Sequence, residues 1–303
     1  MGNILVGTAS WTDKSLVESG KFYPPDAKSA EDRLRFYASE FPIVEVDSSY
    51  YGIPKAEIAQ LWAERTPHSF RFNVKAFRLF TGHQTSPAVF PKDINEVLEP
   101  TLTGKNLYYK DVPEEIRDEL WGRFRQALAP LRHAGKLGAV HFQFAPWMVF
   151  RAASFCHIEE CIRQMDGYLL AVEFRNETWF TEKNAPRTLA FERERNLVNV
   201  IVDAPQGPAN SIPAVWEVTC PELAIVRLHG RNHETWNKKG LKTSAERFNY
   251  DYSTEELSGI ADSVRKLAEN VGEVDVILNN NFEDQGQRNG REIARMLAPQ
   301  RAT

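Results

Sequence analysis

Residues 44–51 of the chain read VEVDSSYY, and the first four of them alternate between apolar and acidic side chains. In a β-strand successive side chains point to opposite faces, so Val44 and Val46 share one face while Glu45 and Asp47 share the other. Two carboxylates on one face of a strand inside a globular protein need either water or a compensating charge. The pattern therefore predicts a strand with one apolar face and one charged face.

Similar short segments, rich in β-branched residues, recur along the whole chain. The predicted strands span residues 4–10, 43–48, 70–76, 138–144, 170–175, 197–203, 224–229 and 274–280. Helical patterns between them predict helices over residues 29–39, 54–65, 113–134, 154–165, 186–195, 254–269 and 286–297. The sixth connection, 204–222, is rich in proline and is expected to contain at most a short helical turn.

Eight strands separated by mostly helical connections predict an α/β fold, a single (β/α)8 TIM-type barrel that spans residues 1–303 as one domain. A doubly wound open sheet is the alternative. It would normally carry a glycine-rich phosphate loop after its first strand, and GTASWTDKS (7–15) is not such a loop. The long connections after strands three and seven, 77–112 and 230–253, are expected to form lids or specificity loops, or else inert surface.

The composition places limits on partners and location. The chain has 303 residues, 42% of them hydrophobic and 26% charged, as in ordinary globular proteins. A net charge of -4 argues against broad wrapping of nucleic acid but allows a locally basic cleft. No signal peptide or membrane-spanning segment is visible, and three cysteines without metal-ligand spacing fit reduced thiols. We therefore expect a cytoplasmic protein with no membrane partner.

The alternation rule, applied to the other strands, gives a polar face on most of them. The apolar sets must pack against the surrounding helices, so the polar sets are predicted to point into the barrel. These polar residues are Glu45, Asp47, Asn73, Lys75, His141, Gln143, Glu173, Arg175, Asn199, Asp203, Arg227 and His229. Because barrel interiors are usually apolar, a charged interior indicates a catalytic or ligand-binding site. A purely structural ion network is the alternative, although buried ion pairs contribute little net stability.

Eight motifs in the chain closely resemble those of the YecE-like family, the domain of unknown function 72. They occur in order as VGTASWTDKSL, FYPP, VEVDSSYYGIP, FRFNVKAF, VHFQFAP, VEFRNETW, VRLHGRN and LNNN. The resemblance covers about residues 4 to 297 and implies a TIM-type barrel. It implies no activity, because the biochemical role of the family is not established.

General acid–base catalysis is the chemistry that the predicted interior supports best. Such catalysis needs a titratable side chain within hydrogen-bond reach of the reacting atom. We expect His229 and Glu173 to serve in this way, with Lys75 as a further base if burial lowers its pKa. Glu45 and Asp47 complete the candidate catalytic set. For His229 an ordinary place in the core is the alternative.

Cationic and amide side chains in the same motifs predict an anionic ligand. Arginine binds phosphate or carboxylate through paired hydrogen bonds, and amides add further donors. The candidate binding residues of this kind are His141, Gln143, Arg175, Arg227, Arg231, Asn279 and Asn280. For each arginine, a salt bridge to a nearby carboxylate is the alternative role.

Aromatic residues follow several strands and are predicted to surround the mouth of the barrel. The candidates to stack on a base or a sugar are Trp11, Tyr50, Tyr51, Trp147, Trp179 and Trp236. Packing beneath the long connections is the alternative for each of them. In the seventh connection, positive charge would come from Arg231, Lys238, Lys239 and Lys242. A nucleotide or nucleic-acid segment fits such a rim better than a bare sugar does.

No cofactor is expected, although a single Mg²⁺ ion held by Glu45, Asp47 or Glu173 remains an alternative. A multi-zinc site is poorly supplied, because only two histidines lie on predicted strands. A glycosidase pair of Glu173 with Glu45 or Asp47 is a further alternative. However, barrel glycosidases place their carboxylates after strands four and seven, where this chain has Gln143 and His229.

The leading hypothesis is an enzyme that uses general acid–base chemistry on a phosphorylated ligand derived from a nucleotide or nucleic acid. The ligand, a phosphorylated small molecule or a nucleic-acid segment, would bind at the mouth formed by the carboxyl ends of the strands. One alternative is a non-catalytic nucleic-acid-binding module. Others are a sugar-phosphate isomerase and a glycoside hydrolase. The oligomeric state is not predicted.

Overall fold

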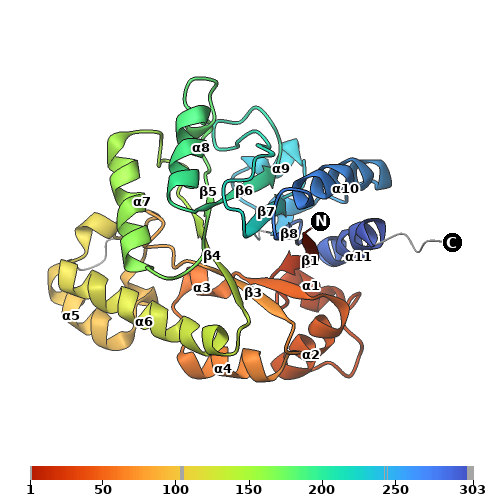
Figure 1. The fold of residues 1–303 in the computed structure, drawn as a ribbon. Coiled ribbons are helices and arrows are strands. Elements are labelled where there is room, and N and C mark those ends of the chain that lie inside the picture. The colour runs from red at the N-terminus through yellow and green to blue at the C-terminus, as the bar shows by residue number, and fades with distance from the viewer. Residues whose placement is uncertain (1, 103–105, 242, 244, 299–303) are drawn as a thin grey trace.

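A computed structural model describes residues 2–102, 106–241, 243 and 245–298. Eight parallel strands follow one another in sequence order and close into a barrel (Figure 1). They are β1 (Asn3–Ala9), β2 (Ile43–Val46), β3 (Arg71–Lys75), β4 (Leu137–Gln143), β5 (Leu170–Glu173), β6 (Val198–Asp203), β7 (Leu223–Leu228) and β8 (Glu273–Leu278). The predicted (β/α)8 TIM-type barrel is confirmed, and each predicted strand overlaps an observed one.

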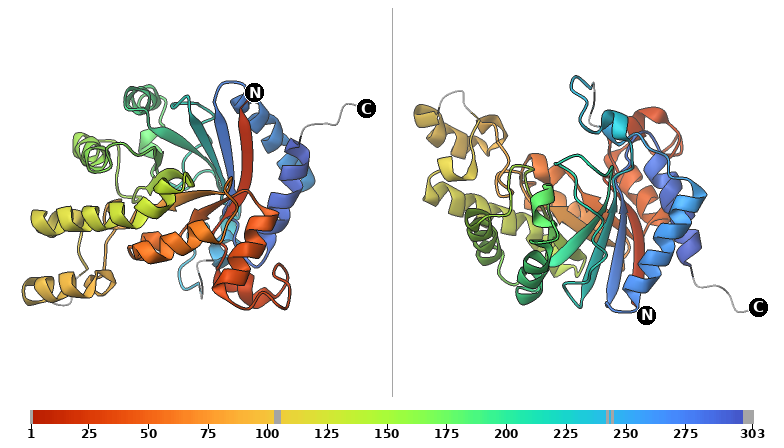
Figure 2. Two further views of the ribbon diagram at one scale, coloured as in Figure 1. Left: turned by 60° about the horizontal axis from the view of Figure 1, so that its bottom comes forward. Right: turned by 90° about the horizontal axis from the view of Figure 1, so that it is seen from above.

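Helices cover the outside of the barrel (Figures 1 and 2). Those that match the predicted set are α2 (Ala30–Glu40), α4 (Ala56–Glu64), α6 (Glu114–His133), α7 (Ala152–Gln164), α8 (Ala185–Glu194), α10 (Thr254–Ala268) and α11 (Gln285–Leu297). Residues 204–222 are all described and none of them is helical, as expected for the proline-rich sixth connection. Among the described residues, no helix combines the length and apolar character needed to cross a membrane.

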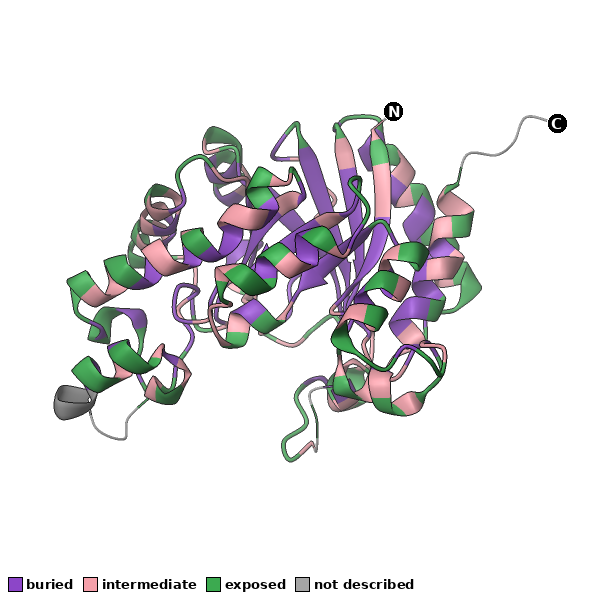
Figure 3. Ribbon diagram, turned by 90° about the horizontal axis from the view of Figure 1, so that it is seen from below, coloured by how far each residue is buried: buried purple, intermediate pink, exposed green. Residues whose placement is uncertain are grey.

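Each layer forms because its sequence alternates with the right period. In α10, Leu257, Ile260 and Val264 recur at the helical period and are buried against the strands. The helix begins with a capping box, in which Ser253 and Glu256 satisfy each other's backbone N–H groups. Figure 3 shows the result, with buried residues along the strands and on the inner faces of the helices.

The strand register brings the predicted polar faces into the interior. Glu45 on β2 is level with Asn73 on β3, and Lys75 on β3 is level with His141 on β4. Residues that are level on neighbouring parallel strands point to the same face of the sheet. Space for them comes partly from Gly138 on β4, where an added Cβ would lie 2.3 Å from Oδ1 of Asn73.

Strand β6 is an exception to the predicted pattern. Its register sets Val200 level with Ile225 and Val202 level with Arg227, so the valines of β6 face the interior. Asn199 and Asp203 therefore lie on the outer face, and their predicted inward orientation was wrong. The physical reason is that polar groups of the connections, and not apolar helix faces alone, meet these residues. Nδ2 of Asn199 donates to the carbonyl of Val215 in the helix-free sixth connection at 3.1 Å, and Asp203 pairs with Arg231 of the seventh.

The two long connections contain structure that the sequence pattern did not predict. The β3–β4 connection forms α5 (Lys92–Leu102), which lies beside α6 and away from the barrel (Figure 2). A paired contact between Arg123 and Asp93 joins the two helices. The β7–β8 connection contains the short helix α9 (His233–Trp236). Two further short helices, α1 (Lys14–Ser19) and α3 (Ser48–Tyr51), follow β1 and β2.

Candidate functional site

Arg227 lies at the centre of a buried ionic cluster inside the barrel. Its Nη1 donates to Oε2 of Glu173 at 2.5 Å, and its Nη2 donates to Oε1 of Glu45 at 2.6 Å. His141 lies between the same two carboxylates, with Nδ1 2.9 Å from Oε2 of Glu45 and Nε2 3.3 Å from Oε2 of Glu173. All four side chains are fully buried. Strands β2, β4, β5 and β7 are thus joined through one network of charges.

The network keeps both buried carboxylates ionised. Burial by itself would raise the pKa of Glu45, but Arg227 and then His141 lower it far below its usual range. The pKa of Glu173 is also lowered, because Arg227, Arg175 and His229 together outweigh the effect of burial. Burial acts to lower the pKa of Arg227, and the two carboxylates raise it above its ordinary value. Each ionised group of the network therefore keeps its neighbours in their charged state.

A second layer of polar side chains lies above this cluster, towards the carboxyl ends of the strands. Lys75 places Nζ 3.0 Å from Oδ1 of Asp47 and donates to Oε1 of Gln143 at 3.2 Å. Arg175 donates through Nη1 to Oε1 of Glu173 at 2.7 Å. The side chains of Lys75 and Arg175 are 9% and 15% exposed, so these two cations are accessible at the mouth.

His229 lies beside Arg175 in the same layer. Burial lowers the pKa of His229 to about 3, so the ring is neutral near pH 7. Its Nε2 lies 3.1 Å from Nη1 of Arg175 and 3.4 Å from Nη1 of Arg227. Guanidinium groups can only donate, so Nε2 must accept and the ring proton belongs on Nδ1. Nδ1 lies 2.7 Å from the side-chain amide of Asn279. To accept the proton on Nδ1, this amide must turn by half a rotation so that its oxygen faces the ring.

Aromatic rings flank the two accessible cations. Nζ of Lys75 lies 4.9 Å from the centre of the Tyr50 ring, and the guanidinium of Arg175 lies 5.4 Å from the centre of the Trp236 ring. Cations over aromatic faces are stabilised by the ring quadrupole. Tyr51 is exposed, and its ring meets Tyr50 edge-on at 5.0 Å. Tyr50, Tyr51 and Trp236 therefore lie close to these cations, with Trp236 itself buried, and their stacking on a ligand stays a prediction.

Arg78 and His83, from the segment after β3, join the mouth without having been predicted. Arg78 lies over the Tyr50 ring at 5.4 Å, and His83 meets that ring edge-on at 5.3 Å. Burial, followed by the charges of Lys75, Arg78 and Arg175, lowers the pKa of His83 to about 3. Neither residue lies on a strand, so no alternation marked them. The only signal was the length of their connection.

Four predicted binding residues do not reach the cluster. Trp11 packs edge-on against Trp62 in the helix layer. Trp179 is buried against Phe174, on the outward side of β5. The other two are held under the connection after β7: Arg231 pairs with Asp203 and Glu256, and the Asn280 amide donates to Tyr250 and Asn289.

The chemical partners at the mouth are cations and carboxylates in pairs. Within the described ranges, no group of three or more His, Cys, Asp or Glu side chains is arranged to hold a metal ion. Lys238 and Lys239, in the connection after β7, are exposed, and Lys242 lies outside the described residues. Trp147, also exposed, follows β4.

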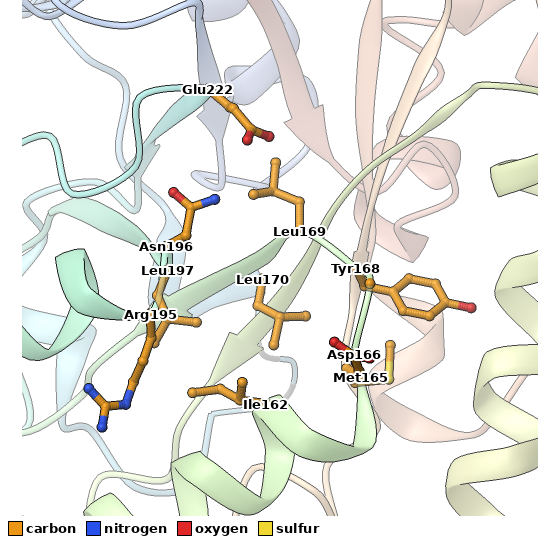
Figure 4. Close-up of a pocket in the computed structure, with 11 residues that line it drawn as sticks. Ile162, Met165, Asp166, Tyr168, Leu169, Leu170, Arg195, Asn196, Leu197 and Glu222 are labelled. Atoms are coloured by element: carbon orange, nitrogen blue, oxygen red, sulfur yellow. The ribbon is translucent and has the colours of Figure 1, made fainter.

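A cavity of about 410 Å³ opens at the opposite end of the barrel (Figure 4). It lies where β5 and β6 begin, and its lining includes Asp166, Tyr168, Leu170, Arg195, Leu197 and Glu222. Active sites of this fold lie at the carboxyl ends of the strands, whereas the amino-terminal end serves stability. We therefore place the candidate site at the mouth above Arg227.

The fold and the site define a class of protein: a closed parallel barrel whose interior carries a buried ionic cluster beside its apolar side chains. Over residues 5–303 the chain matches the family described as "Protein of unknown function DUF72", and it belongs to that family, as its motifs had indicated. It is 30% identical to the UPF0759 protein YunF of Bacillus subtilis (strain 168) over 296 residues, which cover 97% of this chain and 94% of the relative.

Two solved structures share the architecture. A DUF72 family protein of Enterococcus faecalis V583 is 27% identical, with a TM-score of 0.78 over 99% of this chain and 97% of the other. A DUF72 family protein of Thermotoga maritima MSB8 is 27% identical, with a TM-score of 0.75 over 97% of this chain and 99% of the other. These similarities support the fold and the family, and their descriptions assign no reaction.

Proposed function

We propose that the mouth of the barrel binds a phosphorylated ligand derived from a nucleotide or nucleic acid, and that the protein is an enzyme acting on it by general acid–base catalysis. Lys75, Arg78 and Arg175 hold the anionic group, and His229 exchanges the proton. The observation that carries the proposal is Arg78. Its Nε is buried yet has no hydrogen-bond partner among the described residues.

The charges at the mouth favour an anion. In the buried cluster and the layer above it, the three carboxylates of Glu45, Asp47 and Glu173 are matched by three cations, Lys75, Arg175 and Arg227. Arg78 then adds a further positive charge, because no carboxylate among the described residues pairs with it. The unmatched guanidinium of Arg78 lies over the Tyr50 ring, in a partly buried place where interactions between charges are stronger than in water. A phosphate group at that point would restore the balance.

Arg175 links binding to proton transfer. Its hydrogen bonds to acceptors among the described residues run through Nη1, so Nε and Nη2 are open to a ligand. A phosphate that draws this guanidinium towards the mouth releases Nε2 of His229. Loss of the neighbouring guanidinium and the negative charge of the phosphate both raise the pKa of His229 from about 3, so the neutral ring, with its lone pair beside the ligand, can then serve as a general base. Glu173 orients Arg175 and is itself too strongly held as an anion to take a proton.

The same electrostatics disfavour a glycoside hydrolase. That chemistry needs one protonated carboxyl group as the acid and a second carboxylate as nucleophile or base. Glu45 and Glu173 both have lowered pKa values and share one arginine. Neither can therefore be the acid near neutral pH. Isomerisation of a sugar phosphate needs no such acid and falls within the proposed ligand class.

Thermal unfolding with inorganic phosphate, adenosine monophosphate and ribose 5-phosphate tests the binding step, with chloride at equal ionic strength as the reference. A ligand at about 100 times its Kd stabilises by about 2.7 kcal/mol. For a domain of this size that corresponds to a rise in Tm on the order of 5 °C. Arg78→Gln should abolish the rise, whereas Arg231→Gln, which removes an arginine from outside the cluster, should preserve it. No rise with any of the three ligands would refute the proposal.

Phosphorus and proton NMR of the same mixtures tests catalysis. We expect the wild-type protein to convert a ligand that it binds, and His229→Asn to bind it but lose most of the turnover. General acid–base groups typically contribute about 10²–10⁴-fold to rate. Binding that weakens steeply with salt and shows no turnover in any mixture would instead establish the alternative, a non-catalytic nucleic-acid-binding module.

A further inference from the structure

A groove of about 440 Å³ lies beside the mouth, between the β3–β4 connection and the start of α7. It is separate from the ionic cluster and shares no residue with it. The residues that shape the groove and enter the argument are Tyr108, Lys110, Trp147, Arg151 and Ser154. Its cationic residues suit a phosphate group, and its aromatic residues suit a base.

The cationic end is built around the first turn of α7, a helix of 13 residues. The N-cap residue is Arg151, whose side chain does not cap the turn, and its carbonyl accepts from the N–H of Ser154. The N–H groups of Ala152 and Ala153 form no hydrogen bond within the described part of the chain. Ser154 in that turn is only 3% exposed, and its hydroxyl has no hydrogen-bond partner among the described residues. Lys110 and Arg151 are exposed and form no ion pair within the described part of the chain. Two free N–H groups, an unpaired hydroxyl on a residue that lines the groove and two cations together suit a phosphate group.

The aromatic end is formed by Trp147. Its side chain is 48% exposed, although its indole N–H donates to the carbonyl of Gly82 at 3.0 Å. The ring is therefore fixed in position while one side of it meets water. Tyr108 meets it edge-on at 6.3 Å. A fixed and accessible indole is suited to stacking on a planar base.

Aromatic contacts connect this groove to the mouth. The Trp147 ring lies 5.6 Å from the His83 ring, and His83 lies 5.3 Å from Tyr50, over which Lys75 is placed. Two intervening rings, those of His83 and Tyr50, thus link Trp147 in the groove to the proposed phosphate site at the mouth. A net charge of -4 on the whole chain limits the positive surface to a short footprint.

We infer that this groove is a second phosphate-and-base subsite, and that the ligand of the mouth is a short single strand of nucleic acid that occupies both sites. One phosphate lies at Lys75, Arg78 and Arg175. A neighbouring base stacks on Trp147, and the phosphate beyond it binds at Ser154 on the first turn of α7. This inference rests on the proposed function for its first phosphate and goes further by naming the class of ligand.

Binding of inorganic phosphate, thymidine monophosphate and the single-stranded tetranucleotide of thymidylate, measured by calorimetry, tests the inference. We expect the tetranucleotide to bind at least about tenfold more tightly than the monophosphate, because it alone can stack a base on Trp147 while its phosphates occupy both sites. Trp147→Ala should remove the advantage, and Trp147→Phe should keep part of it. Ser154→Asp, which introduces a negative charge at the second phosphate, should weaken the tetranucleotide. Ser263→Asp on the exposed face of α10 is its matched control.

The outcomes separate the two proposals. Equal binding of the tetranucleotide and the monophosphate, unchanged by Trp147→Ala and Ser154→Asp, overturns the second subsite and leaves the proposed function intact. A monophosphate that is weakened by Ser154→Asp but not by Lys75→Met binds in the groove alone and overturns the spanning ligand. Loss of tetranucleotide affinity in both Trp147→Ala and Lys75→Met, with Trp147→Phe and Ser263→Asp close to wild type, supports it. Failure of all three probes to bind overturns the proposed function itself.

Discussion

Asp275 on β8 makes the stability of this barrel depend on pH in an unusual direction. Its side chain faces the interior and is 1% exposed. Oδ2 accepts a hydrogen bond from Nδ2 of Asn73 at 2.7 Å, and Oδ1 has no partner among the described residues. Burial, reinforced by the charge of Glu273, raises the pKa of Asp275 from 3.8 to about 8. The folded protein therefore holds a proton there that the unfolded chain loses.

The sign and size of the effect follow from linkage. Because the folded pKa lies above the unfolded value, the contribution of Asp275 to stability is fully present below about pH 3.8 and is lost as the pH rises towards about 8. The loss is about 1.4 kcal/mol for each pH unit in that window. Between about pH 5 and pH 7 the free energy of unfolding should therefore fall by about 3 kcal/mol through this group alone.

Asp275→Asn removes the titration and keeps an oxygen for Asn73. Urea unfolding of both proteins, followed by circular dichroism at several pH values, gives their difference in unfolding free energy, in which other titrations cancel. We expect the variant to gain about 3 kcal/mol over wild type between about pH 5 and pH 7. Glu273→Gln removes the smaller of the two causes that raise the pKa of Asp275 but leaves the carboxyl buried, so it should retain most of the pH dependence. A difference between Asp275→Asn and wild type that stays constant across this range would refute the reasoning.

Three further predictions concern the interior. Arg227→Met leaves Glu45 and Glu173 buried without their shared partner and should cost about 3–5 kcal/mol of unfolding free energy in urea. The folded pKa values of these two glutamates lie below 4.5, so their stabilising contribution, complete above that pH, should fade in acid titrations of the wild-type protein as the pH falls. Gly138→Ala would force a Cβ to 2.3 Å from Asn73 and should lower Tm by several degrees in calorimetry, by about 1–3 kcal/mol of overpacking.

Matched variants give these predictions their controls. Arg193→Met removes an arginine from an exposed pair with Glu217 and should cost about 1 kcal/mol or less. Gly122→Ala places a methyl group where nothing lies within 4 Å, on the helix α6, so it should be neutral or slightly stabilising. If either control matched its interior counterpart, burial would not be the cause. Retention of full stability in acid would contradict the predicted role of the two glutamates.

Most of the barrel could be predicted because its strands alternate with a period of two. That rule places Glu45, Lys75, Glu173 and Arg227 in the interior without any further information. It fails in β6, where the segment outside the strand is not a helix and offers backbone carbonyls to Asn199. The alternation shows which face of a strand is polar. Whether that face points into the barrel or outward depends on the helix or connection that packs against the strand.

The mouth was less predictable than the cluster beneath it. Arg78 and His83 lie in a connection without periodicity, so nothing in their spacing indicates that they meet Tyr50. Trp179 follows a strand just as Trp236 follows another, yet the first packs outward and the second lies against Arg175. The conformation of the connections decides between these outcomes. The helix α5 was missed for a related reason, since its sequence is polar and includes a proline.

The balance of charge in the buried cluster has a consequence for how this lineage can diverge. Replacing one ionised residue leaves its partner charged, buried and unpaired. Tolerated changes in the cluster must therefore come as compensating pairs of substitutions on different β-strands. Uncharged side chains around the opening, such as Tyr51 and Trp147, carry no charge that needs a partner and can be exchanged one at a time. We expect related proteins to keep the residues of the buried ionic cluster together while those at the mouth vary. The same barrel could then bind several related ligands.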